Sequence, residues 1–182
     1  MTRGFRTIRD GVTAFAMLAL IWLIAAKLNS DAETVHSGAF HAADGDSLAI
    51  GGERMRLRGI DAPELAQSCE RGGKQWACGR EARDVLQRLV SEAGTQCGGT
   101  ERDQYQRLLV ICRSGALDIN GQMVRTGYAV SYGGYRREED EARGQRLGLW
   151  AGTFERPRDF RDDKRLHSGG IVRMIGQAVG WN

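Results

Sequence analysis

Three short clusters hold the acidic, basic and aromatic side chains that could carry out chemistry. They are DGDS at 44–47, RLRGIDAPE at 56–64 and DQYQR at 103–107. Carboxylate oxygens bind hard cations such as Ca²⁺, and guanidinium groups suit phosphate oxygens. An aromatic ring can stack on a nucleic-acid base. Their joint order therefore indicates metal-assisted phosphate chemistry, although each cluster alone is a weak signal.

The first cluster places Asp44 and Asp46 on either side of a glycine. An Asp-Gly-Asp sequence is usually only a turn, because these residues favour turn conformations. As a functional site, the two carboxylates would present oxygen ligands to a cation such as Ca²⁺. The later ligand positions of an EF-hand loop are absent, so this is not an EF-hand.

The second cluster places Asp61 and Glu64 around Pro63. Proline fixes its own backbone and biases Ala62 toward an extended conformation, which would hold both carboxylates at a strand end. One carboxylate could then hold a metal while the other activates water. The alternative is an ordinary solvated strand end.

Arginines surround both the second and the third cluster. Arg54, Arg56 and Arg58 share one face of a strand by their period of two, and at least some of them face solvent. Arg102 and Arg107 flank Tyr105, so a phosphate and a base could bind there together. A solvated hairpin would show the same residues.

The hydrophobic pattern predicts the elements that position these clusters. Three short strands are expected between residues 36 and 60, with Gly51-Gly52 as the hairpin turn before the last. Two further strands are expected near 95–98 and 107–112, and helices over 80–93, 118–126 and 136–147. The predicted fold class is α+β: a five-stranded OB-fold barrel packed with about three helices, plus an N-terminal hydrophobic helix.

In their order and spacing, the clusters resemble the staphylococcal nuclease (thermonuclease) family, specifically its exported bacterial members. The family pattern is Asp-Gly-Asp-Thr, Arg-Leu near Asp-x-Pro-Glu, Asp-x-Tyr-Gly-Arg, and a closing Gly-Leu/Ile-Trp. This chain has DGDS, RLRGIDAPE and DQYQR, followed by GLW at 148–150. The resemblance covers about residues 38–150. It implies the same OB fold that the strand pattern predicts.

The resemblance implies a metal site at four positions. Asp46 and Asp61 match the carboxylates that bind Ca²⁺, and Ala62 matches a residue that contributes its backbone carbonyl. Asp44 matches an acid that lies near the metal without binding it directly. Ca²⁺ is therefore the expected cofactor.

The resemblance also implies the catalytic groups. Glu64 matches the proposed general base, Arg56 and Arg107 match the two arginines that grip the phosphate, and Tyr105 matches a ring near the bound nucleotide. Gln106 replaces the family's glycine, and it would be strained if that turn requires a positive φ. The tyrosines after Gly127 fall near substrate-contacting positions in an unclear register, so they are left unassigned.

The N-terminus reads as an export signal or a membrane anchor. Residues 11–26 contain no charge, three arginines precede them and Lys27 follows. As a helix, this run spans roughly 24 Å, and Leu28 with a snorkelling Lys27 would extend it to a marginal membrane span. Ser30-Asp31-Ala32 has the pattern of a cleavage site. We expect a periplasmic or extracytoplasmic domain, anchored in the inner membrane by about residues 11–28 or secreted after cleavage near Ala32.

The four cysteines agree with export, because an even number in an exported domain predicts disulfides. Three pairings are possible. We favour Cys69–Cys78, which closes a Gly-rich loop, and Cys97–Cys112, which joins adjacent strands. A four-cysteine zinc site is the alternative, but no C-x-x-C spacing is present.

Charge and length limit the remaining possibilities. The formal net charge is +3 over 182 residues. Residues 1–30 hold four bases and one acid, so the remainder holds 22 of each and is neutral. A wholly basic nucleic-acid-binding chain is excluded, and local charge must bind any nucleic acid.

The expected domain organisation has four parts. We expect a basic stub and signal or transmembrane segment over 1–30, a tether over 31–37, the nuclease-like domain over 38–155, and a tail over 156–182 with one short helix after Ser168-Gly169-Gly170.

The resulting hypothesis is a Ca²⁺-dependent nuclease that hydrolyses phosphodiester bonds of DNA and RNA outside the cytoplasm. The alternatives are a catalytically weak or inactive OB module that binds nucleic acid or a protein, and an envelope structural protein. The membrane is an expected partner if the leader is uncleaved, and no protein partner is inferable.

Overall fold

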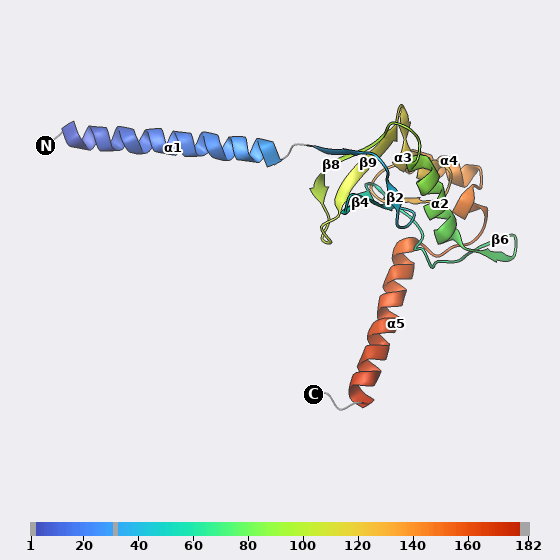
Figure 1. Cartoon of the computed structure of the whole chain (residues 1–182). Helices are drawn as coiled ribbons and strands as arrows, with labels where there is room; N and C mark the ends of the chain where they lie inside the picture. Colours follow the sequence, from blue (N-terminus) through green and yellow to red (C-terminus); the bar gives the residue numbers. More distant parts are fainter. Residues whose placement is uncertain (1–2, 31–32, 179–182) are drawn as a thin grey trace. The chain divides into compact units, whose positions relative to one another are not determined.

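The computed structural model describes the backbone of residues 3–30 and 33–178, and the side chains of residues 10–27 and 33–167. The chain divides at Thr34 into two units. The first contains helix α1 (Arg3–Ser30), and the second is the folded domain (Figure 1). We describe each by itself.

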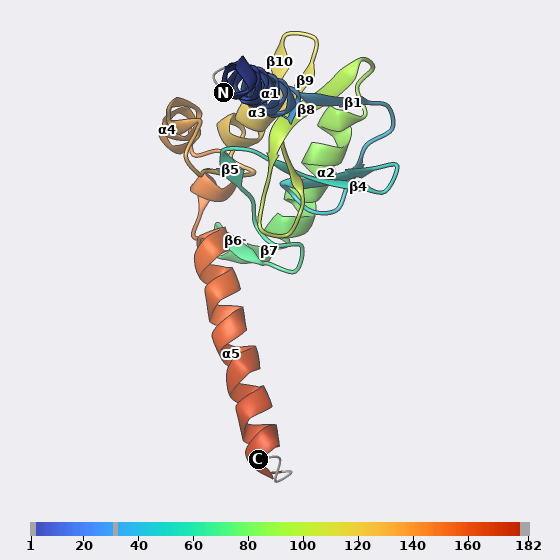
Figure 2. The same ribbon diagram turned by 90° about the vertical axis from the view of Figure 1, so that its left-hand side faces the viewer.

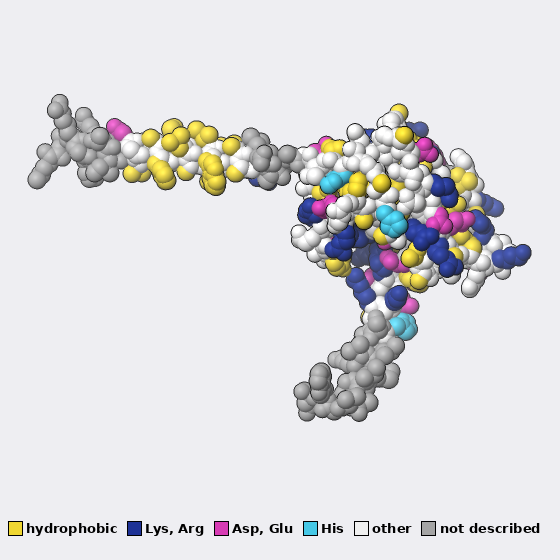
Figure 3. Space-filling view, viewed as in Figure 1, with side chains coloured by type: hydrophobic (Ala, Val, Ile, Leu, Met, Phe, Trp, Pro, Cys, Tyr) yellow, Lys and Arg dark blue, Asp and Glu magenta, His cyan; other side chains and the backbone are white. Residues whose placement is uncertain are grey.

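Helix α1 contains an 18-residue stretch, Asp10–Lys27, that is long and apolar enough to cross a membrane. None of that stretch is buried, and its apolar side chains are visible along the helix (Figure 3). A cleavable signal sequence would have the same length and composition. The expected cleavage site includes Asp31 and Ala32, which lie outside the described residues.

The domain is built on one curled, mixed sheet of seven strands in the order β1-β8-β9-β4-β3-β2, with β10 paired to β9 (Figure 1). The strands are β1 (Thr34–Ser37), β2 (His41–Ala42), β3 (Ser47–Ile50), β4 (Glu53–Leu57), β8 (Thr95–Arg102), β9 (Leu108–Ser114) and β10 (Leu117–Asp118). The expected Gly51-Gly52 turn joins β3 to β4, with φ values of 55° and 88°. The prediction of five strands missed the edge strands β1 and β10, whose residues show no clear alternation of apolar and polar types.

Strands β4 and β9 pair in parallel, and this pairing brings the second cluster next to the third. The fully buried Asn120 stabilises the junction. Its amide nitrogen donates to the carbonyls of Arg58 and Val110, and its oxygen accepts from the backbone nitrogen of Cys112. A buried amide that satisfies several backbone groups is costly to remove, so Asn120 helps to set the relative position of the two clusters.

Helices cover the sheet close to the expected positions. They are α2 (Cys78–Val90), α3 (Ile119–Arg125), α4 (Arg136–Gly144) and a 3₁₀ turn, η1 (Gly148–Ala151). The apolar face of α2 packs against the sheet and against α3. Gln87 ties α2 to the chain entering β2, because its side chain bonds the carbonyl of Phe40 and the backbone nitrogen of Ala42.

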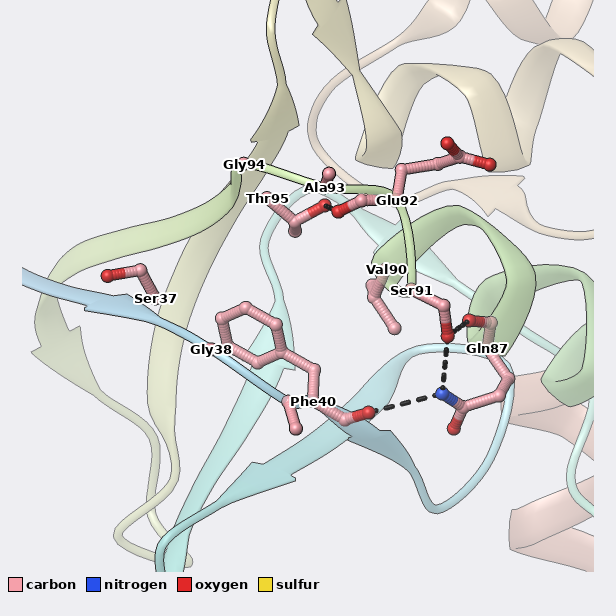
Figure 4. Close-up of a pocket in the computed structure, with 11 residues that line it drawn as sticks. Ser37, Gly38, Phe40, Gln87, Val90, Ser91, Glu92, Ala93, Gly94 and Thr95 are labelled. Atoms are coloured by element: carbon pink, nitrogen blue, oxygen red, sulfur yellow. Dashed lines mark hydrogen bonds between the residues drawn. The ribbon is translucent and has the colours of Figure 1, made fainter.

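A hollow beside this contact is lined by Phe40, Gln87, Ser91 and neighbouring residues (Figure 4). The amide nitrogen of Gln87 donates to the carbonyl of Phe40 and to the hydroxyl of Ser91. The bond to Phe40 joins α2 to the chain entering β2, and the bond to Ser91 closes the end of α2, so both serve the fold.

Two small sheets complete the domain. Strand β5 (Ile60–Asp61) pairs with β11 (Val130–Ser131), and β6 (Cys69–Arg71) pairs with β7 (Lys74–Trp76). The Gly-rich loop expected between Cys69 and Cys78 therefore contains a hairpin. Both expected disulfides form: Cys69–Cys78 clamps this hairpin to the start of α2, and Cys97–Cys112 joins β8 to β9. Paired cysteines exclude the four-cysteine zinc alternative in this structure.

The tail differs from the expectation. Helix α5 spans Pro157–Ala178, so it begins 11 residues before Ser168 (Figure 2). Proline is favoured at the first position of a helix, because that position needs no backbone donor. The helix expected near residues 171–178 forms only the last turns of α5, and its side chains lie outside the described ones. The preceding chain is attached to the hairpin through the pairing of Thr153 with Glu70.

Candidate active site

The DGDS segment is a tight turn that carries Asp46 into the domain. The backbone nitrogen of Asp46 donates to Asp44 Oδ1 at 2.9 Å, which closes the turn. A Cβ at Gly45 would lie 2.7 Å from that of Ala62 and 2.8 Å from that of Ala82. Only glycine therefore permits this approach, which leaves the carboxylate of Asp46 almost completely buried.

Arg56 links the two buried carboxylates. Its Nη2 lies 2.8 Å from Asp46 Oδ2 and 2.7 Å from Asp61 Oδ1. Burial alone would lower the pKa of Arg56, but the charges of Asp46 and Asp61 outweigh burial and raise it. Arg56 thus stays charged beside the pair. Asp61 is held there because β5 pairs with β11.

Ionisation of the Asp46 carboxyl is disfavoured by its burial, despite the ion pair with Arg56. Burial raises its pKa to about 7, and the nearby carboxylates of Asp44 and Asp61 also raise it. Arg56 and the backbone nitrogen of Ala62, which donates to Asp46 Oδ2 at 3.1 Å, act in the opposite direction. Burial therefore disfavours the charged form of Asp46 more strongly than Arg56 and Ala62 favour it.

Glu64 lies at the mouth of the site. Gln67 holds its backbone: Gln67 Oε1 accepts from the backbone nitrogen of Glu64, and Gln67 Nε2 donates to the carbonyl of Glu155. The carboxylate of Glu64 accepts a hydrogen bond from Arg161 Nη1 at 2.9 Å. Arg161 Nη2 reaches Asp61 at 3.0 Å, so one guanidinium from α5 joins both acids of the Asp-x-Pro-Glu cluster.

The DQYQR segment is a turn organised by Asp103. Its Oδ1 accepts from the backbone nitrogens of Tyr105 and Arg107, and its Oδ2 accepts from Arg107 Nε at 2.8 Å. Burial would raise the pKa of Asp103, but these hydrogen bonds outweigh burial and lower it. Gln106 has a φ of 64°, so the turn does require the left-handed conformation that suits the family's glycine.

Arg107 extends from this turn toward the DGDS segment. Its Nη1 donates to Ser47 Oγ at 3.3 Å, while Asp103 occupies the opposite edge of the guanidinium. The ring of Tyr105 lies beside Arg107, 5.6 Å from its Cζ, and is about half exposed. One guanidinium edge and one aromatic ring are thus both accessible at the rim of the site.

A cavity of about 860 Å³ brings most of the predicted residues together. Of the predicted site residues, those that line it are Asp44, Arg56, Asp61, Glu64, Tyr105 and Arg107. Asp46 and Ala62 are buried and do not line it. Tyr132, which the sequence left unassigned, also lines this cavity.

Sequence reasoning missed the contribution of the tail. Arg158, Arg161 and Arg165 of α5 line the same cavity. A readable signal was present, because Pro157 marks a helix start and the three arginines follow at helical spacing. Gln67 and Asp103 were also missed as the residues that position Glu64 and Arg107.

The residues present fit a hard divalent cation in their chemistry. Asp46, Asp61 and the carbonyl of Ala62 would supply only oxygen ligands, which Ca²⁺ prefers. Burial raises the pKa of Asp46, and a cation bound there would favour its charged form. Within the part of the chain that the structure describes, no three His, Cys, Asp or Glu side chains form a ready ligand cluster. Guanidinium groups of Arg56 and Arg161 engage these carboxylates instead.

Comparison with known proteins agrees with this geometry. A family model described as staphylococcal nuclease homologue matches residues 54–152, which is more than half of the chain. The chain belongs to that family. The matched residues of this chain include its Asp-x-Pro-Glu and DQYQR clusters, and the match ends before α5.

Individual relatives extend the comparison. The chain is 33% identical over 115 residues to the succinoglycan biosynthesis protein ExoI of Rhizobium meliloti, covering 59% of this chain and 60% of that protein. It is 34% identical over 119 residues to the probable staphylococcal-like nuclease CAN3 of Oryza sativa subsp. japonica, covering 62% and 29%. It is 30% identical over 119 residues to an uncharacterized endonuclease of Haemophilus influenzae, covering 59% and 62%. The chain thus spans less than two thirds of each of these relatives.

Proposed function

We propose that this chain is a Ca²⁺-dependent nuclease that hydrolyses phosphodiester bonds of DNA and RNA outside the cytoplasm. The observation that carries the proposal is the meeting of two arginines, three acids and an aromatic ring, all predicted from the sequence, in one cavity. The nuclease names of several family members support the reaction class.

Asp46, Asp61 and the carbonyl of Ala62 would hold Ca²⁺, with Asp44 supporting Asp46 through its turn. Bound there, the cation would polarise a phosphoryl oxygen and lower the pKa of water. Asp46 is buried and neutralised on one side by Arg56, so its carboxylate is rigidly oriented. Carboxylate and carbonyl oxygens are the ligands that Ca²⁺ takes.

Glu64 is the proposed general base. It stands at the open side of the cavity, where its backbone is fixed by Gln67 while its carboxylate is partly exposed. A base in that position can take the proton of an attacking water. Arg161 must leave Glu64 for that step, because a paired carboxylate is a poorer proton acceptor.

Arg56 and Arg107 are the proposed phosphate ligands. They approach the DGDS turn from strand β4 and from the turn before β9, since Arg56 bonds Asp46 and Arg107 bonds Ser47. Negative charge grows on the phosphate oxygens as water attacks, and preorganised guanidinium groups stabilise it. Tyr105, half exposed beside Arg107, would stack on a base or sugar.

The extracytoplasmic location rests on two features. Two disulfides form in the structure, and disulfides persist in oxidising compartments. Helix α1 is long and apolar enough for an anchor or a signal, and basic residues at its N-terminal end favour retention of that end in the cytoplasm.

The test uses the full chain, oxidised and purified in a non-ionic detergent. We expect it to degrade single-stranded DNA and RNA when Ca²⁺ is present and to stop when a chelator is added. Folded protein that remains inactive with Ca²⁺, Mg²⁺ and Mn²⁺ would contradict the proposal. Such protein that still binds nucleic acid would instead be the inactive OB module.

A further inference from the structure

Helix α5 places three arginines along the active-site cavity. Arg158, Arg161 and Arg165 are spaced by three and four residues, so they lie on one side of the helix. The outer two are largely exposed, at 68% and 66% of the side chain, whereas Arg161 is 27% exposed. Figure 3 shows basic side chains gathered where α5 joins the domain.

These arginines change the charge of the cavity. Among its described lining residues, those from the sheet and its loops comprise four arginines and four carboxylates, which balance. Helix α5 adds three arginines and one carboxylate, Asp162. The net positive charge of the cavity lining therefore comes from α5, although residues 31–182 as a whole sum to zero charge.

The contacts of α5 span the cavity from one reactive cluster to the other. Arg161 reaches Glu64 and Asp61 on one side. Arg165 Nη2 donates to the hydroxyl of Tyr105 at 3.2 Å on the other side. Helix α5 therefore borders the cavity between the two clusters.

We propose that the arginine face of α5 is a phosphate-binding subsite for the single strand on either side of the bond to be cut. The proposal rests on the proposed function for the identity of the ligand. It assigns a role to a segment beyond residue 152, where the family match ends. Arg158 and Arg165 are separated by about 10 Å along the helix, far enough to contact phosphates of different nucleotides.

Without substrate, Arg161 forms ion pairs with Asp61 and Glu64. Its guanidinium occupies two carboxylates with proposed roles in the reaction: Asp61 as a metal ligand and Glu64 as the base that accepts a proton from water. A phosphate offers it an equivalent anionic partner, and guanidinium groups bind both kinds of oxygen through the same planar geometry. Arg161 can therefore change from carboxylate to phosphate when the strand enters.

The test measures binding of a fluorescein-labelled 12-nucleotide single strand by anisotropy. It uses the full chain in non-ionic detergent with a chelator, so no turnover occurs. Each lost phosphate contact reduces the slope of log K against log salt by about 0.7 for single strands. We expect Arg158→Gln with Arg165→Gln to flatten the slope by about 1.4 and to weaken binding. We expect Arg158→Lys with Arg165→Lys to keep the slope, because the charge remains.

The matched control is Arg83→Gln with Arg137→Gln, which removes two charges from α2 and α4 outside the cavity. It should flatten the slope much less. The inference is overturned if both Gln pairs have the same slope, if the Lys pair loses as much as the Gln pair, or if the wild-type chain does not bind. Wild-type protein that binds with this dependence but cuts nothing would sink the proposed hydrolysis and leave the subsite standing.

Discussion

Asp103 holds Arg107 by the Nε–Nη2 edge of its guanidinium. Asp103 Oδ2 lies 2.8 Å from Arg107 Nε and 2.7 Å from Nη2, which leaves Nη1 directed toward Ser47. A charge-assisted pair of this kind fixes orientation as well as charge. Arg107 is thus presented to the cavity by its own turn, four residues from the acid that positions it.

Asp103→Asn should lower kcat/KM by about ten- to hundredfold, because small errors in the position of a catalytic group are costly. The amide oxygen can still accept from the backbone nitrogens of Tyr105 and Arg107, so the turn and the melting temperature should change little. Steady-state hydrolysis of single-stranded DNA measures the effect. Arg107→Ala is the reference variant, and its kcat/KM is expected to fall by about 10²–10³-fold. Equal kcat/KM in Asp103→Asn and wild type would remove the positioning role.

Glu64→Gln should lower kcat by about 10²–10⁴, since it removes a general base but keeps the shape of the side chain. Ca²⁺ should still raise the melting temperature of the variant, because Glu64 is not among the proposed ligands. Glu92→Gln, on the exposed turn after α2, is the control and should retain full turnover. Undiminished kcat in Glu64→Gln would exclude Glu64 as the base.

Much of this site could be predicted from the sequence because its residues lie in short, ordered clusters. Pro63 fixes the backbone between Asp61 and Glu64, and the glycine of DGDS is required by the close approach of Ala62. The restriction by proline is visible in the sequence, whereas the approach of Ala62 to Gly45 depends on the fold. The order and spacing of the clusters predict residues of which most line one cavity in the structure, and their catalytic roles stay predictions.

The contact of Arg161 with Asp61 could not be predicted in the same way. The two residues are 100 positions apart, and their meeting depends on the direction in which α5 leaves the domain. Edge strands β1 and β10 were missed for another reason: their residues, with no buried side chain in either strand, show no alternation of apolar and polar types. Pairing with a neighbour, rather than their own pattern, makes them strands.

Replacing Cys97 and Cys112 together with alanine should lower the free energy of unfolding by about 3 kcal/mol, because the disulfide closes a loop with a sequence separation of 15. Both cysteines are fully buried in the main core, so lost packing adds to this effect. Urea unfolding of oxidised protein measures it. The Cys69 and Cys78 double variant is the comparison, and it should affect the hairpin and the smaller core first. Four reactive thiols in the native wild-type protein would refute both disulfides.

Gln106→Gly should stabilise the domain. Gln106 adopts a φ of 64°, which costs a residue with a side chain about 1–2 kcal/mol, whereas glycine adopts it freely. The greater freedom of glycine in the unfolded chain offsets part of this gain, leaving about 0.5–1 kcal/mol. The backbone contacts of the turn, from Gln106 nitrogen to Asp103 and from Arg102 to the Gln106 carbonyl, do not need the side chain. Gln104→Gly is the matched control, because Gln104 has no positive φ and should lose stability. A lower unfolding free energy in Gln106→Gly would show that the glutamine side chain stabilises the turn by more than its backbone strain costs.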